Sequence, residues 1–129
     1  EVLNMIKKIL LVMVGLIQMF NGAYMLLHSQ AWFNNAAADT GPYNAHFVHD
    51  VGATFVVVGF SLWACVWRSQ YWPAAIAGAG FLCAHGLIHI VGLFDGHAHH
   101  ALRDSIAIVL PACLALWAAW PSDKVVAHA

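Results

Sequence analysis

Histidine and aspartate are the residue types in this sequence whose spacing can support chemistry. The chain has nine histidines in 129 residues, against five lysines and arginines together. His46, His49 and Asp50 stand at i, i+3 and i+4, and His85 and His89 stand at i and i+4. On a helix, these spacings place the side chains of each set on one face. An i, i+4 pair of histidines can bring two imidazole nitrogens to one cation, and a facing histidine or carboxylate can complete three or four ligands.

These spacings predict a metal site built from histidine and aspartate. Imidazole suits copper, zinc, nickel and iron alike, and we expect copper first, with zinc or iron next. Each aspartate is either a ligand itself or the group that orients a ligand histidine through its second nitrogen. Arg103 is an alternative partner for either carboxylate. The predicted metal ligands are His46, His49, Asp50, His85, His89 and Asp104.

Two other interpretations of the same residues stay open. One is a structural hydrogen-bond network without metal, because buried polar groups pair with one another. The other is a single b-type haem held by His49 and His89, with Gly52, Gly86 and Gly92 making room for it. The sequence contains no serine-hydrolase, phosphate-loop or metalloprotease motif. We therefore expect no catalytic activity of the chain on its own.

The elements that must position these residues are membrane-spanning helices. Apolar residues make up 62% of the chain and charged residues only 9%, whereas a soluble domain has roughly 45–50% and about 25%. Four stretches are apolar and long enough to cross about 30 Å of hydrocarbon, and they run over about 5–27, 46–67, 72–94 and 101–120. None shows the alternation that is typical of barrel strands. We predict an all-α fold, a single domain over 1–129 that forms an integral membrane four-helix bundle.

Basic residues predict the orientation of this bundle. With the amino terminus inside, only Arg103 lies outside, and the basic residues on the inner side are Lys7, Lys8, Arg68 and Lys124. The prediction is an N-in, C-in topology. On it, every histidine except His128 lies on the outer side. We expect a bacterial inner-membrane protein whose histidine-rich side faces the periplasm.

Three smaller features predict whether the first helix is retained and how the helices pack. The apolar part of the first span, 9–27, exceeds the roughly 7–15 residues of a signal-peptide core, so we expect a retained helix. Small residues within 52–59 and 74–86 allow the second and third spans to approach closely. Pro111 removes an amide donor from the fourth span and is expected to kink it.

Residues 41–52 read GPYNAHFVHDVG. This segment resembles a G-P-x-N-x-H-F-V-x-D-x-G run in small, uncharacterised bacterial four-helix membrane proteins that also have a histidine-rich third helix. The resemblance covers nearly the whole chain and implies the same fold, without implying a function. It draws attention to Asn44, His46 and Asp50. Asn44 also has a local role, since it can cap the second helix by accepting a hydrogen bond from an amide of the first turn.

Together these patterns predict a small inner-membrane protein with a metal site on its outer side. It would act in metal handling or as an accessory subunit of a larger membrane metalloenzyme, because its short loops leave little space for a substrate pocket. The expected partners are the lipid bilayer and a larger membrane complex, and the chain can form oligomers. Nucleic acid is excluded as a partner, because the net charge is −1 and there is no basic run.

Overall fold

A computed structural model describes residues 1–94 and 101–122 of the protein. Its long helices are α1 (Val2–Leu27), α3 (Ala45–Trp67) and α4 (Trp72–Phe94). The fourth long helical segment consists of α5 (Ala101–Asp104), the π-helical segment η3 (Ser105–Val109) and α6 (Leu110–Ala119), which follow one another directly. Each of these four is long and apolar enough to cross a membrane, and no strand occurs within the described residues. The prediction of an all-α fold with four helices long and apolar enough to span a membrane is therefore confirmed.

Two short helices complete the described chain. A 3₁₀ turn, η1 (Ser69–Tyr71), connects α3 to α4. The segment between the first two spans was expected to be a loop, but it contains helix α2 (Ser29–Ala36). This helix is held by Trp32, whose indole Nε1 donates to Asn21 Oδ1 over 2.9 Å, and by a 2.6 Å hydrogen bond between the Ser29 and Tyr43 hydroxyls.

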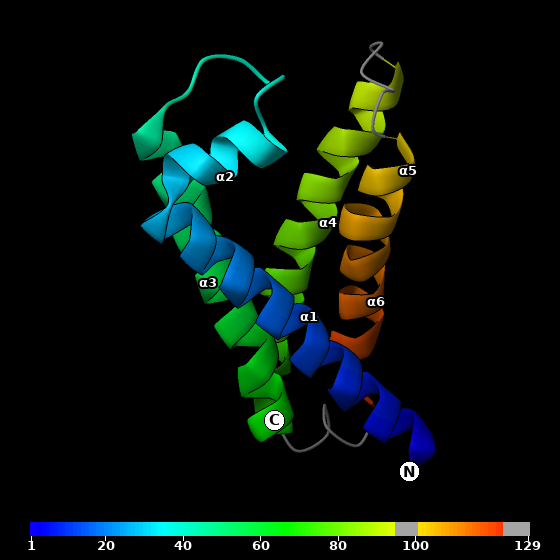
Figure 1. Cartoon of the computed structure of the whole chain (residues 1–129). Coiled ribbons are helices and arrows are strands. Elements are labelled where there is room, and N and C mark those ends of the chain that lie inside the picture. The colour runs from blue at the N-terminus through cyan, green and yellow to red at the C-terminus, as the bar shows by residue number, and fades with distance from the viewer. Residues whose placement is uncertain (95–100, 123–129) are drawn as a thin grey trace.

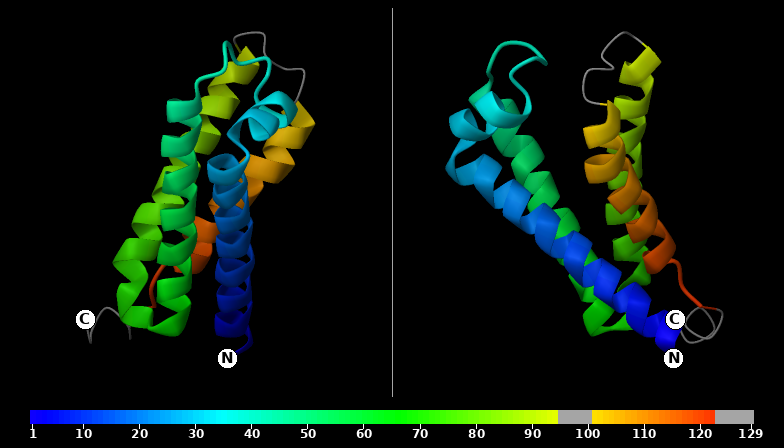
Figure 2. Two further views of the ribbon diagram at one scale, coloured as in Figure 1. Left: turned by 60° about the vertical axis from the view of Figure 1, so that its left-hand side comes forward. Right: turned by 45° about the vertical axis from the view of Figure 1, so that its right-hand side comes forward.

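The long helices form a ring in which neighbours are antiparallel. Helix α1 packs against α3 and α6, and α4 packs against the same two helices. The pair α1 and α3 lies close to the pair α4 and α6 where α1 begins and α6 ends, and the pairs diverge toward the α2 end (Figures 1 and 2). The start of α1 and the end of α6 therefore share one end of the bundle, as an even number of spans requires.

Glycines place α1 and α3 in close backbone contact. A Cβ atom on Gly15 would lie 3.1 Å from the carbonyl oxygen of Gly59, and one on Gly52 would lie 3.1 Å from that of Gly22. The two glycines of each helix are seven residues apart and run in opposite directions, as antiparallel helices in heptad register require. We call these four residues the glycine seam.

All but one of the buried positions of each helix follow the same heptad spacing, and the exceptions are Val14 in α1 and Val58 in α3. The other positions recur in steps of four and three, which keeps one narrow stripe facing the partner helix along the whole length. In α1 these positions are Leu11, Gly15, Gln18, Gly22 and Met25. In α3 they are Val48, Gly52, Phe55, Gly59 and Leu62. The outward faces of all four long helical segments carry exposed apolar side chains, as a lipid environment allows. Examples are Phe20, Val57, Ile88 and Leu110.

The expected approach of the second and third spans is present but secondary. Helices α3 and α4 are in contact, and a Cβ atom on Gly78 would collide with the Ser61 hydroxyl. The most extensive contact is nevertheless between α1 and α3. Gly15 and Gly22 on the first span provide it, and sequence reasoning had not singled them out.

The predicted Asn44 cap of α3 is confirmed, because Asn44 Oδ1 accepts a hydrogen bond from the Phe47 amide at 3.1 Å.

The glycine seam predicts a measurable cost for a single methyl group. Gly22→Ala places a Cβ atom against the Gly52 carbonyl oxygen, so the helices must separate. We expect the free energy of unfolding, measured by SDS titration of detergent-solubilised protein, to fall by about 1–3 kcal/mol.

Gly80→Ala is the matched control, because a Cβ atom at Gly80 would meet nothing within 4 Å. This variant is expected to keep the stability of the parent protein or to gain up to about 1 kcal/mol, since alanine favours the helix. Equal effects of the two substitutions would contradict close packing at the seam.

Candidate functional site

The best-defined polar cluster joins α4 to α5 at the α2 end of the bundle. His89 Nδ1 lies 2.8 Å from Asp104 Oδ2, and Arg103 Nε donates to Asp104 Oδ1 over 2.9 Å. The Asp104 side chain is 13% exposed and that of His89 is 29% exposed. Both carboxylate oxygens of Asp104 are therefore engaged. We call His85, His89, Arg103 and Asp104 the α4–α5 cluster.

The hydrogen bond to Asp104 determines the tautomer of His89. An ionised carboxylate can only accept hydrogen bonds, so His89 Nδ1 is the donor. In the neutral ring, Nε2 then carries the lone pair. A carboxylate that holds Nδ1–H in this way is a common support for a metal-binding histidine, because it fixes the ring and raises the basicity of Nε2.

His85 completes the cluster with an aromatic environment. Its ring lies 4.9 Å from the His89 ring, at an interplanar angle of 74°. The same imidazole stacks on Phe81 with centroids 6.4 Å apart and meets Phe55 edge-on at 5.6 Å. Phe55 is 5% exposed and comes from α3. The i, i+4 histidines are thus held side by side, one by a carboxylate and the other by two phenyl rings.

A π-helical turn brings Asp104 to this position. The Leu110 amide donates to the Ser105 carbonyl, five residues earlier, instead of the four of an α-helix. The extra residue rotates the preceding turn, so that Asp104 is half-buried and Ser105 is exposed. Pro111 follows directly in the first turn of α6. A kink was predicted at Pro111, and the structure has a π-helical segment directly before it, which turns a carboxylate toward α4.

The three predicted ligands on α3 lie elsewhere. His46 Nε2 is 3.4 Å from Asp50 Oδ2, but their side chains are 88% and 66% exposed, and His49 is exposed too. The glycine seam explains this, because it turns the stripe containing Val48 and Gly52 inward. In the described part of the chain, no three His, Cys, Asp or Glu side chains gather so that they could hold a metal ion.

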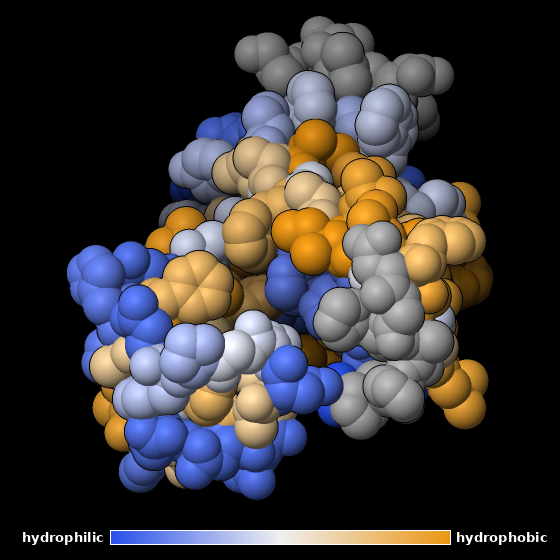
Figure 3. Space-filling view, turned by 90° about the horizontal axis from the view of Figure 1, so that it is seen from above, coloured by the Kyte–Doolittle hydropathy of each residue, from blue (hydrophilic) through white to orange (hydrophobic). Residues whose placement is uncertain are grey.

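Five of the six predicted ligands therefore form two sets, and His49 belongs to neither. His85, His89 and Asp104 lie together, with Asp104 as the supporting carboxylate, and His46 pairs with Asp50 on the surface of α3. Seen from the α2 end, hydrophilic residues gather over the α2 side and apolar residues over the α5 side (Figure 3). The histidines at 97, 99 and 100 lie outside the described residues.

Two of the three glycines expected to accommodate a haem, Gly52 and Gly86, have other neighbours. A Cβ atom on Gly52 would collide with Met25 of α1, and one on Gly86 would lie 3.6 Å from the Cα of Val109. Both glycines therefore serve contacts between helices. His49 is exposed on the surface of α3.

Comparison of the chain with family models, with curated proteins and with solved structures gives no match. Sequence reasoning had found His85, His89, Asp104 and Arg103, and it had left open whether Asp104 is a ligand. It missed the aromatic support of His85. The signal available for that support was the i, i+4 spacing of Phe81 and His85 on one helix face.

The geometry predicts unequal effects of two conservative substitutions. Asp104→Asn removes the charge that Arg103 and His89 share, and we expect a loss of about 1–3 kcal/mol in the free energy of unfolding. Asp50→Asn acts on the exposed pair with His46, and such a pair contributes about 0–1 kcal/mol to the free energy of unfolding. SDS titration of both variants checks this, and an equal loss would mean that the α4–α5 cluster is not a tertiary contact.

Proposed function

We propose that the protein is a small integral membrane metal-binding protein whose site is the histidine pair of the α4–α5 cluster. His85 and His89 are the ligands, and Asp104 orients His89 without binding the metal. The observation that carries this proposal is the 2.8 Å hydrogen bond from His89 Nδ1 to Asp104, which leaves Nε2 as the nitrogen with the lone pair, on a ring whose centre is 4.9 Å from that of His85. Arg103 balances the carboxylate charge at 2.9 Å.

The chemistry of the ligands favours copper, then zinc or iron. Two imidazoles suit all three metals, and geometry and availability select among them. Only two protein nitrogens serve the site, so further coordination positions remain for a donor or an acceptor molecule. Such a site suits transfer of a metal, or delivery to a larger membrane metalloenzyme as an accessory subunit. We place it in a bacterial inner membrane, with the α2 end toward the periplasm, because Lys7, Lys8 and Arg68 lie at the opposite end.

A second candidate function is structural. Both Asp104 oxygens are engaged by His89 and Arg103, so the cluster can hold α4 to α5 with no metal present. Ionisable groups are costly in a membrane unless they are paired, and this arrangement pairs them.

Metal analysis of the protein separates the two functions. The detergent-purified protein, loaded with Cu²⁺ or Zn²⁺ and then desalted, is expected to retain one metal ion per chain by elemental analysis. His85→Ala and His89→Ala should each abolish retention. Asp104→Asn should weaken metal affinity by about 10- to 100-fold, as expected for loss of an orienting partner.

His46→Ala and His49→Ala are the controls, because both side chains are exposed on α3. They should leave metal retention unchanged. Parent protein that holds no metal, but that loses stability in Asp104→Asn, would reject the metal function and support the structural one. A Soret absorption band in the purified protein would instead indicate haem.

A further inference from the structure

A second polar site lies at the opposite end of the bundle, where α1 begins and α6 ends. A cavity of about 290 Å³ opens there between α1, η1, the start of α4 and the end of α6. This volume is at the lower end of the range for ligand pockets, which starts at roughly 300 Å³. The polar residues in its lining are Asn4, Lys7, Lys8, Ser69, Trp72 and Ser122.

Trp72 contributes a donor that lacks an acceptor. Its indole Nε1 is buried, and it has no hydrogen-bond partner among the described residues. A buried donor without a partner costs about 1–3 kcal/mol, so such groups are rare in folded proteins. Trp72 lines the cavity, but neighbouring atoms cover its Nε1, so a rotation of the indole ring must accompany donation to an acceptor seated there.

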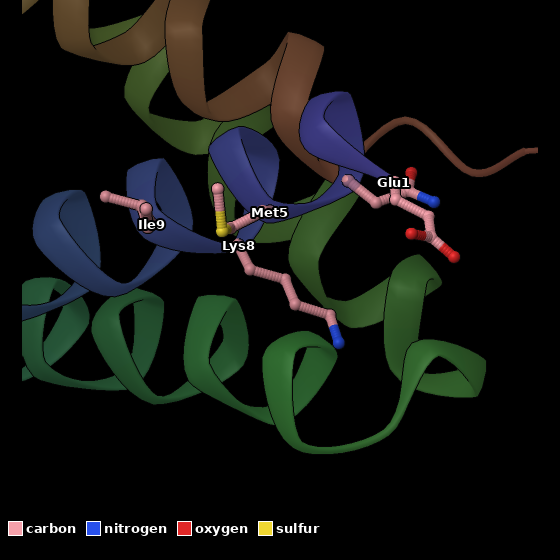
Figure 4. Close-up of a pocket in the computed structure, with 5 residues that line it drawn as sticks. Glu1, Met5, Lys8 and Ile9 are labelled. Carbon is pink, nitrogen blue, oxygen red and sulfur yellow. The ribbon is translucent and has the colours of Figure 1, made fainter.

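The two lysines differ in how they are engaged. Lys7 Nζ donates to the Trp120 carbonyl over 3.1 Å and lies 5.2 Å from the centre of the Trp117 ring. Lys8 is exposed, and within the described residues it forms neither a hydrogen bond nor an ion pair. Its side chain runs from α1 toward α3 (Figure 4).

Among the described residues, the acidic side chain at this end, Glu1, lines a different hollow. Glu1 lines, with Met5, Lys8 and Ile9, an open depression of about 390 Å³ on the outside of α1 (Figure 4). It does not line the cavity of Lys7 and Trp72. Among the described residues, the lining therefore combines two positive charges, hydroxyl and amide groups and an unsatisfied N–H, and it includes no carboxylate.

We propose that this cavity binds a phosphate group, held by Lys7 and Lys8 and by the Trp72 indole N–H. Basic pockets between helices at the cytoplasmic surface bind the headgroups of anionic lipids, and a soluble phosphate presents the same chemistry. Lys8 supplies charge at the mouth and Trp72 a directed hydrogen bond deeper inside. This site is independent of the metal function, because it lies at the other end of the bundle.

Native mass spectrometry of the full chain in detergent micelles tests the proposal. Phosphatidylglycerol and phosphatidylcholine are added in equal amounts, and the fraction of protein that retains each lipid is measured. The parent protein is expected to retain phosphatidylglycerol in preference. Lys8→Gln should reduce that retention about fivefold, as expected for one lysine near an anionic headgroup, and Trp72→Phe should reduce it about tenfold through loss of a charge-assisted hydrogen bond.

Arg68→Gln is the matched control. It removes the same charge at the same end, but Arg68 is not in the cavity lining, and its guanidinium lies 4.9 Å from the Trp67 ring. Retention in this variant should match the parent. Equal losses in Lys8→Gln and Arg68→Gln would overturn the site, and so would unchanged retention in folded Trp72→Phe. If Trp72→Phe does not fold, the comparison of Lys8→Gln with Arg68→Gln decides alone.

Inorganic phosphate identifies the source of the ligand. If millimolar phosphate displaces phosphatidylglycerol from the parent protein, a soluble phosphate compound is the ligand. If the lipid stays bound, the ligand is the lipid headgroup. Both results support a phosphate site, whereas equal retention of phosphatidylcholine and phosphatidylglycerol would contradict it.

Discussion

Close backbone contact between α1 and α3 is the constraint on which the rest of the structure depends. In a lipid environment, apolar side chains gain little by leaving the solvent, so helices associate through close packing and polar contacts. The glycine seam provides this packing, with carbonyl oxygens of one helix directly against the glycines of the other. It also fixes the rotation of α3. Phe55 is turned inward as a result, where its ring meets His85, while His46 and Asp50 are turned outward.

Polar interactions organise the other pair of helices. The fourth span packs on α4 through small residues, including Ala112, whose carbonyl accepts a weak hydrogen bond from Cys83 Sγ. Its regular helix is interrupted before Pro111, and the π-helical turn directs Asp104 toward His89. Irregular turns of this kind are frequent at functional sites. The bundle thus has an apolar middle, with a histidine and carboxylate cluster at one end and a lysine and indole cavity at the other.

Much of the fold could be predicted from the sequence, because hydropathy and helix length report directly on membrane spans. The four spans, the Asn44 cap and the i, i+4 pairing of His85 with His89 follow from local rules that need no tertiary information. Helix α2 could not be predicted in this way. It depends on hydrogen bonds between Trp32 and Asn21 and between Ser29 and Tyr43, which form only when the chain folds back on itself.

The site was predicted only in part, for a related reason. Spacing along one helix shows which side chains share a face, but the rotation of that face is set by its neighbours. The glycines of α1 therefore decided that His46, His49 and Asp50 lie outside the bundle. The role of Asp104 depended on a π-helical turn, which changes by one residue the face that a sequence pattern indicates.

The central claim is that Asp104 holds His89 with Nδ1 protonated and Nε2 available beside His85. Nitrogen-15 NMR of histidine-labelled protein measures this directly, with His89 assigned from the His89→Ala variant. We expect a protonated Nδ1 and an unprotonated Nε2 at His89, and a shift of the Nε2 signals of His85 and His89 when Zn²⁺ is added. A His89 ring protonated at Nε2, or His85 and His89 signals that do not respond to Zn²⁺, would contradict the account.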